Sequence, residues 1–233
     1  ARAAVGFRHR VADTSLSLGT RARIRALTMH ERVEGGLLES VAPPGYDGAR
    51  VVALGAVAAW DTRDLEFFPR KGAFVEATLE RAAPELGADH AFWGAEIDAR
   101  AYKQLGRRAE HIVAAQARVE LRDGTAPFFE LPTFGGMNIM RGVSEGLFRD
   151  QNGAAAQVEY RSPFVGPIGF VAFAGAGEVF GRFAALGDAA AAWSAGGGVR
   201  LAIDKANGVN ARLDYGVSRN EFSGIYLSVT EAF

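Results

Sequence analysis

The sequence predicts an all-β protein, and more narrowly an antiparallel transmembrane β-barrel. Three observations predict it. Apolar and polar side chains alternate at every second residue along most of the chain. Many of these segments run to about ten residues or more, against about five or six in soluble domains. The connections between them alternate between short and long, as they do in outer-membrane barrels.

The composition excludes several classes of protein. The formal net charge of the 233 residues is -1, too even for the clustered basic face that nucleic-acid binding requires. The chain has no cysteine, so disulfides and thiol chemistry are excluded. Mean hydropathy is +0.01 and no run of about 18 apolar residues occurs, which excludes a transmembrane helix. Transmembrane strands need only alternate apolar residues and fit these values.

About eleven strands are expected. They cover residues 3–10, 15–27, 51–61, 72–85, 91–105, 109–122, 153–163, 167–177, 192–204, 208–218 and 222–233.

The two faces of the expected strands differ in chemistry. In the strand 153–163, Val158 and Tyr160 point to one side, and Glu159 and Arg161 point to the other. The apolar faces are rich in alanine and valine, which would fill a soluble core poorly, while the polar faces carry charges of both signs. The pattern therefore favours apolar faces against lipid and charged faces toward a lumen. A soluble barrel with the apolar faces inside is the alternative.

The connections define two rims. Tight turns are expected at 11–14, 106–108, 164–166 and 205–207, and long loops at 28–50, 123–152 and 178–191. In outer-membrane barrels the short turns lie at the periplasmic rim and the long loops outside. Four aromatic residues are candidates for the girdle at the membrane interface, with packing in a core as the alternative. They are Trp60, Trp93, Phe67 and Phe68.

No catalytic residue, metal site or cofactor is expected. The letters "GVSEG" (142–146) match the G-x-S-x-G nucleophile motif, but Ser144 lies in a loop without the strand and helix which that motif requires. The four histidines, His9, His30, His90 and His111, have no metal-ligand spacing.

Several motifs in order resemble the C-terminal barrel of the BamA/TamA outer-membrane superfamily, the bacterial surface antigen family. They are "AWDTRDLEFFPRKGAFVEATLE" (59–80), "GGMNIMRGVSEGLFRD" (135–150), "VEYRSP" (158–163), "GGGVRLAIDKANGVNARLDYG" (196–216) and a terminal phenylalanine, Phe233. The resemblance covers nearly the whole chain.

The resemblance implies that segment 123–152 folds back into the lumen as a plug. Its tip would be "MRGV", with Arg141 and Gly142, after the glycine pair Gly135 and Gly136. Arg141 would pair with acidic residues of the wall, and Glu159 matches one of them. The family's second partner is an aspartate in an F-x-D-x-G motif. Here that motif reads "FAGAG" (173–177), with Gly175 in place of the aspartate. Glu76, Glu96 and Glu120 are the candidate substitutes.

The resemblance also assigns a role to the last strand. Strand 222–233 would form one side of a weak seam, with Gly224 loosening its pairing, since glycine weakens strands. Tyr226 and Phe233 would belong to the C-terminal assembly signal, Phe233 on the membrane-facing side. Family barrels have about sixteen strands, so upstream strands and a periplasmic domain are expected to be missing from this chain.

The function implied by the resemblance is the insertion or translocation of other proteins at the bacterial outer membrane, without bond chemistry. The implied partners are outer-membrane lipids, a client or passenger polypeptide and the barrel-assembly machinery, with no nucleic acid. Two alternatives remain. The chain could be the membrane anchor of an envelope lipase or secretion passenger, or it could be a passive pore.

Overall fold

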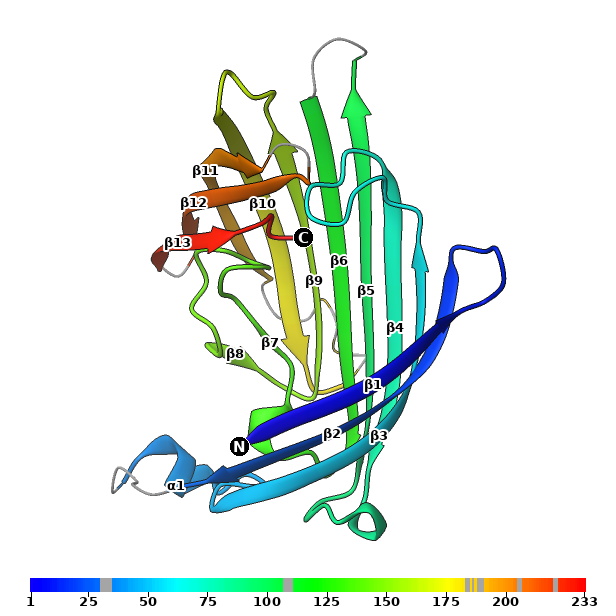
Figure 1. The fold of residues 1–233 in the computed structure, drawn as a ribbon. Coiled ribbons are helices and arrows are strands. Elements are labelled where there is room, and N and C mark those ends of the chain that lie inside the picture. The colour runs from blue at the N-terminus through cyan, green and yellow to red at the C-terminus, as the bar shows by residue number, and fades with distance from the viewer. Residues whose placement is uncertain are drawn as a thin grey trace.

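The computed structural model describes residues 1–29, 35–106, 111–182, 185, 187, 191–204, 207–219 and 222–233. Its main element is one curved sheet of eleven strands, in the order β1-β2-β3-β4-β5-β6-β9-β10-β11-β12-β13 (Figure 1). All neighbouring strands are antiparallel. The predicted all-β class, the antiparallel pairing and the number of strands are confirmed.

The strands of the main sheet are β1 (Arg2–Arg10), β2 (Leu16–Thr28), β3 (Gly48–Asp61), β4 (Gly72–Ala82), β5 (Phe92–Leu105), β6 (His111–Gly124), β9 (Asn152–Arg161), β10 (Ile168–Phe180), β11 (Ala192–Asp204), β12 (Val209–Ser218) and β13 (Ser223–Val229). Shorter elements lie in the loops: α1 (Leu37–Val41), the 3₁₀ turns η1 (Pro84–Leu86) and η2 (Phe128–Glu130), and the small β7 (Thr133–Phe134) and β8 (Phe148–Arg149) pair.

Two predicted strands end three or four residues earlier in the structure. The strand expected over 72–85 stops at Ala82, because η1 begins at Pro84. The strand expected over 222–233 stops at Val229, because Thr230 takes a left-handed backbone conformation (φ 71°) that turns the chain out of the sheet. Parts of the turns predicted at 106–108 and 205–207, the start of strand 109–122, and His30 lie outside the described residues.

The alternation places charge on the concave side of the sheet. In β9, Glu159 and Arg161 are buried, whereas Val158 and Tyr160 are exposed on the convex side. The same pattern holds along β12, where Asp214 is buried and Leu213 and Tyr215 are exposed. Within the described residues, no helix is long and apolar enough to cross a membrane.

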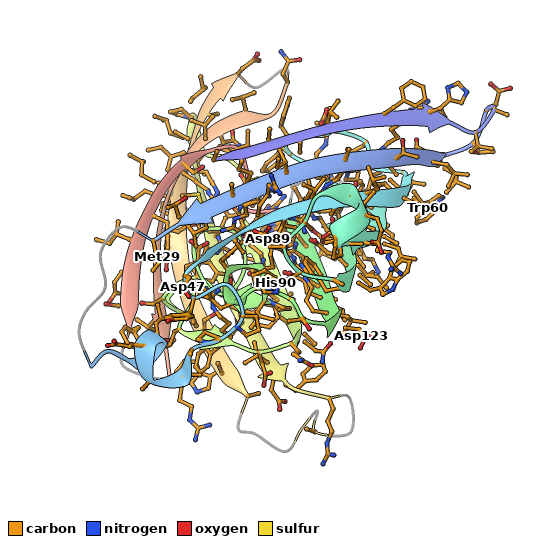
Figure 2. All side chains as sticks on the ribbon, turned by 90° about the horizontal axis from the view of Figure 1, so that it is seen from below. Met29, Asp47, Trp60, Asp89, His90 and Asp123 are labelled. Carbon is orange, nitrogen blue, oxygen red and sulfur yellow. The ribbon has the colours of Figure 1, made fainter. Side chains whose placement is uncertain are left out.

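The two rims of the sheet differ in their connections. Figure 2 looks at the long-loop rim, where Asp47, Asp89, His90 and Asp123 lie. Apolar side chains from two connections and the adjoining strand ends pack together at this rim. This rim cluster comprises Ala49, Val51, Ala53, Ala82, Ala88, Phe92, Ala126 and Phe129. It therefore packs the start of the loop after β6 against the ends of β3, β4 and β5.

The segment between β6 and β9, residues 125–151, is here named the inner loop. It folds back on the concave side of the sheet instead of extending from the rim (Figure 1). Its apolar residues Phe134, Ile139, Met140 and Val143 are buried and pack with Ala155 of β9. The inner loop thus belongs to the interior of the molecule.

The sheet has two edges among the described residues. β1 pairs only with β2, and β13 pairs only with β12. Val5 and Phe7 on β1 and Ile225 and Leu227 on β13 are largely exposed. Each edge therefore offers unpaired backbone groups next to exposed apolar side chains.

Candidate functional site

The tip of the inner loop is shaped by glycines. Gly135 and Gly136 have φ of 117° and 96°, a conformation that side chains rarely allow. The Gly136 amide donates to the Val143 carbonyl oxygen (3.1 Å), which closes a tight bend. Gly142 has φ of 102°, and a Cβ there would lie 2.6 Å from the Gly216 carbonyl carbon in β12. The backbone of the loop tip therefore lies directly against the backbone of β12.

Arg141 joins this tip to two strands. Its Nη2 donates to Glu159 Oε2 of β9 and its Nη1 donates to Asp214 Oδ2 of β12, each at 2.5 Å. The guanidinium also lies 3.6 Å from the centroid of the Phe173 ring of β10. Arg141, Glu159 and Asp214 are almost completely buried. The planar guanidinium of Arg141 donates to two carboxylates at once. Arginine suits this arrangement better than lysine, because its N–H donors point in fixed directions.

Glycines of β11 make room for the partners of Arg141. A Cβ on Gly196 would lie 2.5 Å from Cζ of Phe173, so the ring lies directly over that residue. A Cβ on Gly198 would lie 2.0 Å from Asp214 Oδ1. The run "GGGVR" therefore has a physical reason, because side chains at these inner positions would displace both contacts of the arginine.

The ion pairs extend into a buried network. Arg161 donates to Glu159 (2.8 Å), and Arg200 donates to Asp214 (2.5 Å) and to Glu231 (2.7 Å). Arg212 Nη1 lies 3.8 Å from Asp214. With Arg141 this makes four arginines against three carboxylates, one positive charge in excess. Buried charges persist only when they are paired and hydrogen-bonded, so Arg141 is buried here by sharing Glu159 and Asp214 with the arginines of the strands.

The predicted substitutes for the second partner of Arg141 are wrong. Glu76 pairs with Arg8, while Glu96 and Glu120 pair with Arg118. These carboxylates lie on β4 to β6, and arginines of β1 and β6 already pair with them. The partner that sequence reasoning missed is Asp214. The alternation in "RLDYG" could have indicated it, because it places Asp214 on the polar face of its strand. The alternation in "VEYR" does the same for Glu159.

Gly175 lies on β10 between Gln157 and Ser194 of the neighbouring strands. A Cβ there would lie 2.9 Å from Gln157 Cβ. The carboxylate that the family motif would place at this position is supplied instead from β12 by Asp214.

The edge strand β13 also reaches the tip. The Gly142 amide donates to Tyr226 Oη at 2.8 Å. Gly224 stays in the ladder, opposite Gly216 of β12. Tyr226, Gly224, Gly142 and Arg141 therefore converge on one region of the wall, although two of them come from the inner loop and two from the end of the chain.

The expected membrane-facing position of Phe233 is wrong. Phe233 is buried on the concave side, its ring centroid 6.4 Å from that of Tyr102. Its main-chain oxygen accepts from Arg161 Nη2 at 2.9 Å. The reason is the turn at Thr230, which carries residues 231–233 inward and also brings Glu231 to Arg200. Period-two alternation assumes an uninterrupted strand and could not reveal this turn.

The girdle prediction is wrong for Phe68, and for the exposed tryptophans it stays a prediction. Trp60 and Trp93 are exposed on the convex side. Phe68 is buried and packs edge-on against Phe164 at 5.9 Å, and Phe67 lines a cavity with inward-facing Glu76 and Arg100. The reason is that segment 62–71, between β3 and β4, folds over the concave side.

Asp64, which lies in segment 62–71 itself, holds the two ends of that segment together. Its carboxylate accepts from the main-chain N–H groups of Arg70 (2.9 Å) and Lys71 (3.2 Å). Burial acts to raise the pKa of Asp64, but these hydrogen bonds and the Arg70 guanidinium outweigh burial and lower the pKa below its usual range.

A second anchor of the inner loop was not predicted. Glu130 of η2 is buried, and its carboxylate lies 2.7 Å from Arg23 and 3.3 Å from Arg25 of β2. Arg23 is shared with Glu80 of β4. The signal in the sequence was the triplet of arginines at every second position of "TRARIRA", which needs carboxylates opposite it.

A polar cavity of about 360 Å³ lies between the inner loop and the wall, lined by arginines and glutamates that include Arg21, Arg118 and Glu145. Ser144 is exposed in the inner loop. Across the described residues, no three His, Asp or Glu side chains are grouped so that they could hold a metal ion.

Comparison with known proteins bears on this arrangement. The model of the Omp85 superfamily domain matches residues 47–232. The chain belongs to the Omp85 superfamily. It is a β-barrel protein of the bacterial outer membrane, and the predicted BamA/TamA resemblance is confirmed.

A solved structure shares the fold. The crystal structure of BamA from Haemophilus ducreyi lacking POTRA domains 1–3 matches with a TM-score of 0.67 at 15% identity, over 98% of this chain and 52% of that one. The chain thus spans about half the length of that structure. The KdgM porin, with and without disordered oligogalacturonate, matches with TM-scores of 0.37 and 0.36 at 8% identity, over 100% of this chain and 92% of that one. No curated protein matches the chain.

Proposed function

We propose that this chain supplies the C-terminal strands of a larger outer-membrane barrel, of about sixteen strands, that inserts or translocates other proteins. The observation that carries the proposal is the double pairing of Arg141 with Glu159 and Asp214. It holds the tip of an inner loop against the wall beside an edge strand, β13. Membership of the Omp85 superfamily supports the same activity.

The proposed role of the inner loop is that of a plug. It lies on the concave side and has one anchor on β2 and another on β9 and β12. The rim cluster packs the start of the loop, at Phe129, against the ends of β3, β4 and β5. A loop held on the concave side at two anchors argues against a passive pore. The chemistry is noncovalent, and the partners are outer-membrane lipids, a client polypeptide and the barrel-assembly machinery.

The proposal is tested with Arg141→Ala in the full-length native protein, in cells that depend on it. Arg8→Ala is the matched control, since Arg8 also pairs with a carboxylate but is half exposed. Folded client barrels and secreted proteins are quantified, together with the heat-modifiable folding of the variant itself.

Arg141→Ala is expected to reduce client assembly or secretion several-fold while the variant barrel still folds, and Arg8→Ala is expected to reduce neither. Unchanged assembly together with raised ion conductance would contradict the proposal and favour a pore. Loss of a single secreted enzyme, with client barrels unaffected, would favour the membrane anchor of a passenger.

A further inference from the structure

The edge strand β13 has few ties outside its ladder. It pairs with β12 from Ser223 opposite Val217 to Val229 opposite Ala211. Among the residues that the structure describes, one hydrogen bond joins β13 to a segment other than β12, the bond from the Gly142 amide to Tyr226 Oη (2.8 Å). Apart from its pairing with β12, β13 is therefore joined to the inner loop by a single side chain.

The ring of Tyr226 packs over Gly224 of its own strand, a position called its seat below. A Cβ on Gly224 would lie 2.6 Å from Oη, 2.8 Å from Cζ and 3.1 Å from Cε2 of Tyr226. No real side chain could occupy that space, so the ring lies over Gly224 because residue 224 is glycine. The ring covers an edge glycine, as aromatic residues do in other sheets.

Three glycines from three segments meet at this seat. Gly224 of β13 pairs with Gly216 of β12. A Cβ on Gly216 would lie 2.5 Å from the Arg141 carbonyl oxygen and 2.8 Å from the Gly142 nitrogen. Gly142 is itself buried. The loop tip, β12 and the Tyr226 ring therefore fit together only because all three positions lack side chains.

We infer that Tyr226, seated on Gly224, is a positioning residue that couples the tip of the inner loop to the edge strand. A buried amide that loses its acceptor is destabilised. Withdrawal of the loop therefore loosens β13, and displacement of β13 loosens the loop, since coupling between two sites is reciprocal. The functional consequence of this coupling rests on the proposed function, whereas the coupling itself rests on the contacts alone.

Two variants test the coupling between the loop tip and β13. Tyr226→Phe removes one oxygen and keeps the ring, and Gly224→Ala pushes the ring out of its seat. Tyr215→Phe is the matched control, because Tyr215 is an exposed tyrosine on the convex side of β12. Hydrogen–deuterium exchange is followed by mass spectrometry in the full-length protein in lipid nanodiscs, on peptides that cover 139–145 and 223–229.

The exchange rate is expected to rise about five- to tenfold in both peptides of Tyr226→Phe and Gly224→Ala, as for the loss of one buried hydrogen bond, and in neither peptide of Tyr215→Phe. A rise confined to 223–229, no rise at all, or an equal rise in Tyr215→Phe would overturn the coupling.

A second readout separates positioning from stability. Client assembly by Tyr226→Phe is expected to fall several-fold while the midpoint of its heat-modified migration stays that of the wild type. Raised exchange with wild-type assembly would overturn the positioning role. A wild-type protein that assembles no clients would refute the proposed function, and the exchange result would still decide whether the coupling exists.

Discussion

Ion pairs anchor the inner loop to the sheet at two places. The loop supplies the negative charge at one anchor and the positive charge at the other. Near η2 the loop contributes a carboxylate, Glu130, which arginines of β2 hold. At the tip the loop contributes an arginine, Arg141, which carboxylates of β9 and β12 hold. The same pairing chemistry therefore fixes the start and the tip of the inner loop to different strands of the sheet.

The two anchors differ in how far they are withdrawn from solvent. The side chains of Arg141, Glu159 and Asp214 are all 0% exposed, whereas Arg25 beside Glu130 is 35% exposed. Glu130 also has a partner, Arg23, that Glu80 satisfies independently. Removal of one member of a fully buried pair leaves an uncompensated charge, so the tip anchor is the one that a single substitution breaks.

The largest effect is expected for Glu159→Gln. Glu159 accepts from Arg141 and Arg161 and lies 3.7 Å from Arg200, so its loss leaves three buried guanidinium groups short of charge. Local opening of residues 137–145, measured by hydrogen exchange, is expected to become easier by about 3–5 kcal/mol. Asp214→Asn is expected to cost less, because Arg141 keeps Glu159. An Asp214→Asn effect as large as that of Glu159→Gln would contradict this ranking.

A smaller effect is expected for Glu130→Gln. Arg23 retains Glu80, and the Glu130 main-chain oxygen still accepts from Arg122, so one charged hydrogen-bonded contact is weakened. A cost of about 1.5–3 kcal/mol is expected, visible as faster proteolysis at residues 125–131 with the tip still protected. Cleavage at 137–145 at the same rate would mean that the two anchors act as one unit.

The smallest effect is expected for Arg8→Ala. The Arg8 and Glu76 side chains form an ion pair while 45% and 31% exposed. Exposed pairs contribute about 0–1 kcal/mol and are screened by salt. The thermal midpoint of the heat-modified band should stay within error of the wild type in low and high salt. A shift as large as that caused by Glu130→Gln would show that burial does not rank these pairs.

The sequence predicted those parts of the site that depend on local periodicity. Alternation placed Glu159 on the inner face and Val158 on the outer face, and both positions hold in the structure. It also contained Asp214 on the correct face, but nothing in one sequence shows which inward carboxylate lies opposite the tip of a folded loop. Glu76, Glu96 and Glu120 met the same criterion, and their own arginine neighbours exclude them.

The sequence by itself determined the strands, their faces, the glycine-shaped tip and the residues able to form ion pairs, because each depends on neighbouring side chains. Only the tertiary structure decided which charges meet. The turn at Thr230 brings Phe233 and Glu231 inside, and the fold of the inner loop joins Arg141 to β12 and Glu130 to β2. These pairings depend on contacts between segments far apart in the chain. A buried charge without a partner is costly, so each buried charge must meet an opposite one.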